Sequence, residues 1–185
     1  MPNWCNNAVR LAHDDPKMIE RAQDAFKRGE FLNEFIPCPP ALLEEGVETY
    51  GGDQEAANDA LRANNLKTLG YKSWYDWRRV HWGTKWDVGQ DGDCELDATG
   101  ALDLRFQSAW SAPTEAYERL EAMGFRIRAL YYEPGMDFAG LYEDGDDENY
   151  PVEQALASNF GSDLDAAFGV IAEREADDAE DETGE

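Results

Sequence analysis

Apolar residues in the first part of the chain recur mainly at helical spacing. A short alternating stretch from Trp4 to Ala12 predicts a strand, and Asp15 followed by Pro16 is typical of a helix start. The apolar stripe that follows ends at Gly29, which predicts a helix over residues 16–28. A strand and then a helix are therefore expected at the start of the fold.

The next segment is less regular. Three prolines between residues 30 and 52, with the pair Gly51–Gly52, predict irregular structure there. A helix is expected after Asp53. Another is expected from Ser73, because Ser73 and Asp76 have the spacing of a capping box.

From Lys85 onward the hydrophobic period changes from helical to alternating. Strands are predicted over 102–106 and 125–131, with a helix opened by Pro113 between them. Pro134 and Gly135 predict a turn into residues 136–142 as the hairpin partner, and Ser162 with Asp165 predicts a last helix.

This order of elements predicts an α+β fold of the ferredoxin-like, split β-α-β type, an antiparallel sheet with helices on one face. We expect one domain over residues 1–172, with an irregular and helical insertion at about 31–83. Residues 173–185 contain eight acidic residues and one arginine, so we expect an acidic, disordered tail.

The charge of the chain changes the expected partners. Sixteen basic against forty acidic residues give a formal charge of −24, which opposes direct binding to nucleic acid or to anionic membranes. No apolar run approaches the roughly 20 residues of a membrane span, and the first residues do not resemble a signal peptide. Cys5, Cys38 and Cys94 have no paired spacing and are interpreted as reduced thiols, so we expect a cytoplasmic protein.

Five phrases of the sequence stand out when taken together. They are Met1-Pro2-Asn3-Trp4-Cys5-Asn6-Asn7, Pro39-Pro40, Trp82-Gly83-Thr84-Lys85-Trp86, Phe106-Gln107-Ser108-Ala109-Trp110-Ser111-Ala112-Pro113 and Tyr132-Glu133-Pro134-Gly135-Met136-Asp137-Phe138-Ala139-Gly140. In this order they resemble one family, the YubB-like proteins of bacteriophages and plasmids. The resemblance runs from Met1 to about Tyr142 and implies a ferredoxin-like domain, a fold name that implies no iron–sulfur cluster. It also implies a mobile genetic element as the setting, and it transfers no catalytic residue.

The common catalytic and cofactor motifs are missing from the sequence. The cysteines and histidines lack metal-ligand spacing, and the acidic run 144–148 is interpreted as a solvated turn and not as a calcium loop. There is no nucleophile elbow and no phosphate-binding glycine loop. We expect no cofactor and no metal, and we favour a non-catalytic protein over an enzyme.

One cluster of side chains has the composition of a ligand site. Tryptophan faces, asparagine amides and a lysine can hold a planar or anionic small molecule. The competing interpretation is that the tryptophans pack in the core and the asparagines satisfy turn backbone, which is the commoner role of such residues. The candidate residues are Asn3, Trp4, Asn6, Trp82, Lys85, Trp86 and Trp110.

Three functions therefore stay open. We prefer an acidic binding protein that acts as a nucleic-acid-mimicking decoy for a basic host protein that binds nucleic acid. The second is a small-molecule-binding protein or enzyme that uses the tryptophan, asparagine and lysine cluster. The third is an acidic interaction module whose charge reflects a high-salt host.

Overall fold

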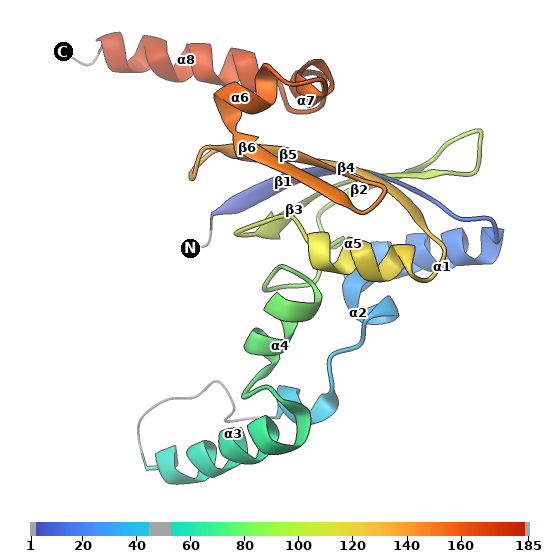
Figure 1. Ribbon diagram of the computed structural model, residues 1–185, viewed down its shortest axis with the longest axis vertical. Coiled ribbons are helices and arrows are strands. Elements are labelled where there is room, and N and C mark those ends of the chain that lie inside the picture. The colour runs from blue at the N-terminus through green and yellow to red at the C-terminus, as the bar shows by residue number, and fades with distance from the viewer. Residues whose placement is uncertain (1–2, 45–52, 184–185) are drawn as a thin grey trace.

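A six-stranded antiparallel sheet organises the molecule, with strand order β2-β3-β1-β4-β5-β6 (Figure 1). The computed structural model describes residues 3–44 and 53–183, with only the backbone for 177–183. The strands are β1 (Trp4–Ala12), β2 (Asp93–Leu96), β3 (Leu102–Ala109), β4 (Arg126–Glu133), β5 (Phe138–Glu143) and β6 (Asp146–Pro151). The helices are α1 (Pro16–Lys27), α2 (Phe31–Phe35), η1 (Pro40–Leu43), α3 (Glu55–Leu69), α4 (Trp74–His81), α5 (Thr114–Glu121), α6 (Val152–Leu156), α7 (Gly161–Phe168) and α8 (Val170–Thr183).

The ferredoxin-like part runs β1-α1-β2-β3-α5-β4. Its strands lie in the order β4-β1-β3-β2, and every neighbouring pair is antiparallel. This connectivity is that of a split β-α-β unit, so the α+β class and the antiparallel sheet are confirmed. The insertion separates α1 from β2, and β5 and β6 extend the sheet beyond β4.

The first helical layer, α1 and α5, covers the inner face of the sheet. Asp15 caps α1 by accepting a hydrogen bond of 3.0 Å from the backbone N–H of Lys17, as its place before Pro16 predicts. The buried stripe of α1, which includes Phe26, packs with Val9 and Leu11 of β1 in the main core. Alternation along β1 sends these residues inward and places Trp4, Asn6 and Arg10 on the other face.

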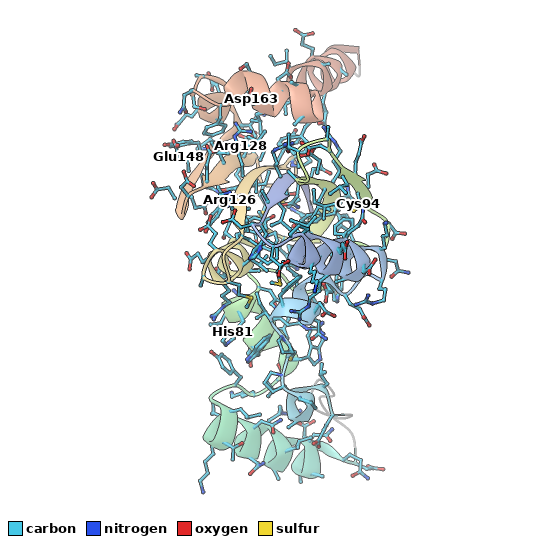
Figure 2. The ribbon with its side chains drawn as sticks, turned by 90° about the vertical axis from the view of Figure 1, so that its right-hand side faces the viewer. His81, Cys94, Arg126, Arg128, Glu148 and Asp163 are labelled. Atoms are coloured by element: carbon cyan, nitrogen blue, oxygen red, sulfur yellow. The ribbon has the colours of Figure 1, made fainter. Side chains whose placement is uncertain are left out.

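A second helical layer, α6 and α7, covers part of the opposite face (Figure 1). Leu130 of β4 and Leu141 of β5 pack there against Val152 and Leu164. The expectation of helices on one face therefore describes α1 and α5 but omits this layer. Arg128 of β4 donates a hydrogen bond of 2.6 Å to Asp163 of α7, which also ties the layer to the sheet (Figure 2).

The insertion extends away from the inner face, with α4 next to α5 and α3 farthest from the sheet (Figure 1). Ser73 caps α4 as predicted, accepting a hydrogen bond from Asp76 N. Gly51 and Gly52, expected in irregular structure, lie outside the described residues.

Two segments near the C-terminus differ from expectation. Residues 170–183 form α8, whereas the sequence predicted a disordered tail over residues 173–185; the alanines and glutamates of α8 are strong helix formers. The acidic run is more than a turn, because Asp144 and Gly145, both with positive φ, form a two-residue hairpin loop into β6. Asp-Gly is a preferred sequence for such loops, because the backbone twist of the turn matches the twist of the two strands that it joins.

Candidate functional site

The segment from Trp82 to Trp86 is fixed to the end of β3. The Thr84 hydroxyl donates to the Ala109 carbonyl at 3.0 Å and accepts from the Ala109 N–H at 3.1 Å. Ser111 donates to the Gly83 carbonyl at 2.7 Å. Two of the phrases that carry the family resemblance therefore pack against each other, and they set where the following side chains lie.

Trp82 itself is a core residue. Its side chain is fully buried, and its indole N–H donates to the Ile36 carbonyl at 2.9 Å. The expectation that Trp82 belongs to a ligand site is thus corrected. It anchors the insertion to the sheet layer, as the core interpretation of the tryptophans proposed.

The Asn3 side chain lies at the turn between β4 and β5. A methyl group at Gly135 would lie 2.8 Å from the Asn3 amide nitrogen and 3.0 Å from a Glu133 oxygen, so the amide sits at the β4–β5 turn. Its carbonyl accepts a hydrogen bond of 3.0 Å from the Trp110 N–H. Asn3 is a turn residue that positions Trp110 through its backbone.

Trp4 and Trp86 form an exposed aromatic pair. Their ring centroids are 5.7 Å apart, and 41% and 36% of their surfaces remain exposed. The Lys85 ammonium lies 4.7 Å from the Trp86 centroid and 5.6 Å from that of Tyr75. The sequence therefore predicted the neighbourhood of Trp4, Lys85 and Trp86 correctly.

Two amides lie beside this pair on the open face of the sheet. Asn6 of β1 and Gln107 of β3 are directly opposite in register, and the Gln107 amide donates to the Asn6 oxygen at 3.0 Å. That bond leaves the Gln107 oxygen and three amide hydrogens of the pair for other partners. Arg105, two residues earlier on the same face, donates to the Ala167 carbonyl at the end of α7 at 2.8 Å.

A loop of residues 86–92 forms one wall of the site. Asp87 accepts hydrogen bonds from the backbone N–H groups of Leu32 and Asn33 at 2.7 and 2.9 Å, which join the loop to the first turn of α2. Burial raises the pKa of Asp87 above its ordinary value, and these bonds oppose that rise. Gly89, with φ +122°, approaches Phe26 so closely that a methyl group would lie 2.1 Å from its carbonyl oxygen.

These groups enclose a cavity of about 590 Å³ that we call the aromatic groove. The loop wall and the Trp4–Trp86 pair face Phe168 at the end of α7. The groove exists because α6 and α7 cover β5 and β4 but leave the outer face of β3 open. We define it by Trp4, Asn6, Trp86, Arg105, Gln107 and Phe168.

A second cavity of about 480 Å³, the cationic pocket, lies on the other side of Lys85. Trp110 lines it with 45% of its surface exposed and with φ +75°, a backbone conformation unusual for a bulky residue. The pocket also uses side chains from α4 and α5. We define it by Tyr75, Arg79, Lys85, Trp110 and Glu115.

Arg105, Gln107 and Phe168 were missed by sequence reasoning. The alternation that buries Leu104 and Phe106 already places residues 105 and 107 on the opposite face, so this signal was available. Phe168 lies at the end of α7, the helix that Ser162 and Asp165 predicted. Its place over the sheet depends on the second helical layer, which was not predicted.

The described residues offer little for metal or thiol chemistry. Among the described side chains, those of residues 3–44 and 53–176, no group of three or more His, Cys, Asp or Glu residues could hold a metal ion. Burial raises the pKa of Cys5 to about 12, so its thiol stays protonated at neutral pH and is a poor nucleophile. None of the helices in this part of the chain is long and apolar enough to cross a bilayer.

Comparison with known proteins yields one structural neighbour. No family model and no curated protein matches the chain. The crystal structure of protein api92 from Yersinia pseudotuberculosis, of the family model DUF1281, is 15% identical with a TM-score of 0.42. The match covers 82% of this chain and 98% of that one.

Proposed function

We propose that this chain is a non-catalytic binding protein that holds a planar small molecule in the aromatic groove. The observation that carries the proposal is the exposed Trp4–Trp86 pair beside the Asn6–Gln107 amide pair. Aromatic faces stack on planar rings, and amide groups hydrogen-bond to the ring edge, so the combination suits a heterocycle with polar edge atoms.

The size and build of the groove agree with this role. Its volume falls within the range of small-molecule sites, and one wall is fixed by Asp87 and Gly89 before any ligand arrives. A preformed wall reduces the ordering cost of binding. The YubB-like resemblance and a mobile-element setting stay predictions that this proposal does not depend on.

Titration of the protein with a panel of planar heterocycles, followed by tryptophan fluorescence, tests the proposal. Heterocycles with edge donors and acceptors should bind, and their carbocyclic analogues should bind more weakly. Trp86→Ala and Gln107→Leu should each weaken binding roughly tenfold or more while leaving stability nearly unchanged, since both side chains are exposed.

Two control variants give this test its meaning. Leu96→Ala removes an exposed apolar side chain on β2, outside the groove, and should leave binding unchanged. Trp82→Ala should destabilise the fold by about 3–5 kcal/mol, because it empties a core position. If Trp86→Ala destabilises the protein as Trp82→Ala does, Trp86 is a core residue and the groove is not a ligand site.

The distribution of acidic residues favours a second candidate function, the nucleic-acid-mimicking decoy. Residues 143–185 hold sixteen of the forty acidic residues and one of the sixteen basic ones. Asp146 and Glu148 lie two residues apart in β6 and therefore on the same face of the strand, where such residues are separated by about 6.8 Å. Such a row of carboxylates can occupy a basic groove in place of phosphates.

Affinity capture from a lysate of the natural host tests the decoy. A basic protein that binds nucleic acid should be captured at low salt and released by high salt or by added DNA. The triple variant Asp144→Asn, Asp146→Asn, Glu148→Gln should capture less of it. Capture that DNA does not displace, or no capture of a basic protein at low salt, counts against the decoy.

A further inference from the structure

The cationic pocket contains two positive charges that the protein does not neutralise. Among the side chains that the structure describes, in residues 3–44 and 53–176, no carboxylate lies within ion-pair distance of Arg79 or Lys85, although the chain has forty acidic residues. Seven other arginines do form ion pairs. They are Arg10, Arg21, Arg28, Arg62, Arg126, Arg128 and Arg174.

The surrounding sequence is positive as well. Residues 62–85 contain six of the sixteen basic residues and a single acid, Asp76. Glu115 lines the pocket, and its carboxylate accepts a hydrogen bond of 3.3 Å from the Thr114 hydroxyl. The three charged groups of the pocket thus sum to one positive charge, which suits an anion despite the negative charge of the whole chain.

The pocket adjoins the aromatic groove. Both cavities use Ala109 in their linings, and the Lys85 ammonium lies 4.7 Å from the centroid of the Trp86 ring, which belongs to the groove. An anionic group beside Lys85 would therefore lie next to a ring stacked on Trp86. The two cavities have the arrangement of two subsites for one ligand.

We propose that the cationic pocket binds the phosphate of a ligand whose heterocycle occupies the aromatic groove, which makes the ligand class a nucleotide. The inference rests on the proposed function and adds the anionic subsite. Arg79 supplies a planar donor group suited to phosphate oxygens, and Lys85 supplies a point charge between the two cavities. The Asn6–Gln107 pair meets the base edge, because side-chain amides can pair with bases through two hydrogen bonds.

Binding of the four ribonucleoside monophosphates AMP, GMP, CMP and UMP, each compared with its nucleoside, tests the inference by fluorescence titration. At least one monophosphate should bind roughly tenfold more tightly than its nucleoside. Arg79→Gln and Lys85→Gln should each remove most of that advantage and leave nucleoside affinity unchanged. Arg126→Gln, at an exposed arginine paired with Asp14 on another part of the surface, should change neither affinity.

The outcomes separate the two proposals. If a nucleoside binds in the groove but its monophosphate binds no more tightly, the anionic subsite is wrong and the groove proposal stands. If the monophosphate still binds more tightly than its nucleoside in both variants, the phosphate binds outside the cationic pocket. Arg79 also lies in the last turn of α4, where a positive charge can stabilise the helix. If Arg79→Gln lowers stability but the monophosphate still binds more tightly than its nucleoside, Arg79 stabilises the helix end and does not bind the phosphate. If no nucleoside or monophosphate binds, the nucleotide inference is overturned, and the heterocycle panel alone decides the groove proposal.

Discussion

At the scale of single residues, Asp97 shows how one carboxylate organises a turn. One of its oxygens accepts hydrogen bonds from Thr99 N, Thr99 Oγ1 and Ala101 N, and the other contacts Arg10. The Thr99 hydroxyl, and next Arg10, lower the pKa of Asp97 below its ordinary value of 3.8. The ionised form is therefore the one that joins the β2–β3 turn to β1.

The stability of the fold should depend on this group in acid. Because its pKa is lower in the folded state, Asp97 stabilises the fold above about pH 4, and the contribution is lost as the pH falls toward the folded pKa. Asp97→Asn should lower the free energy of unfolding at neutral pH, and the difference from the wild type should shrink between about pH 4 and pH 2. Urea unfolding at a series of pH values measures it. A difference that stays constant down to pH 2 would contradict this account.

The candidate site also shows which residue roles the sequence could predict. Trp4, Asn6, Lys85 and Trp86 were selected by composition, and they do lie together. Composition could not separate them from Trp82, because the residue type alone does not say whether a tryptophan is exposed or buried. Exposure depends on which face each element turns inward, and that is decided by contacts between distant segments.

At the scale of elements, local signals were sufficient where one rule decided the structure. Caps and periodicity located α1 and α4, and alternation located β3 and β4. The second helical layer was missed, although the sequence carried a sign of it. Ala129 to Tyr132 is an unbroken apolar run within β4, which indicates a strand buried on both faces.

The C-terminal elements were misassigned because charge was weighed above backbone preference. Asp144-Gly145 is a strong hairpin signal, but its acidic neighbours were interpreted as a solvated turn alone. In the same way, the high acidity of residues 173–183 suggested disorder, while their alanine and glutamate content favours a helix. Net charge is a property of the surface and does not by itself determine local structure.

At the scale of the whole molecule, charge is unevenly distributed. Basic residues are concentrated in residues 62–85, and acidic residues dominate from Glu143 to the C-terminus. In Figure 1 these parts lie toward opposite ends of the molecule, with the sheet between them. A strongly negative chain can therefore still present a local site for an anion, because charges act mainly within a Debye length of about 8 Å in physiological salt.

The remaining self-repulsion predicts a response to salt. Raising NaCl from about 0.05 M to about 1 M should move the urea midpoint upward, because screening relieves repulsion between carboxylates. KCl should act equally, since screening does not depend on the identity of the cation. A midpoint that falls or stays constant would contradict the prediction and would remove support from adaptation to a high-salt host.

The strand order has a last consequence for copies of the chain that meet in solution. β2 and β6 end the sheet, and each has backbone groups on one side that no strand of the described sheet pairs. Asp93 and Glu95 project from the first, and Asp146 and Glu148 from the second. The carboxylates on two such edge strands repel each other at neutral pH. They therefore oppose edge-to-edge pairing between copies of the chain, which would otherwise extend the sheet into a fibre.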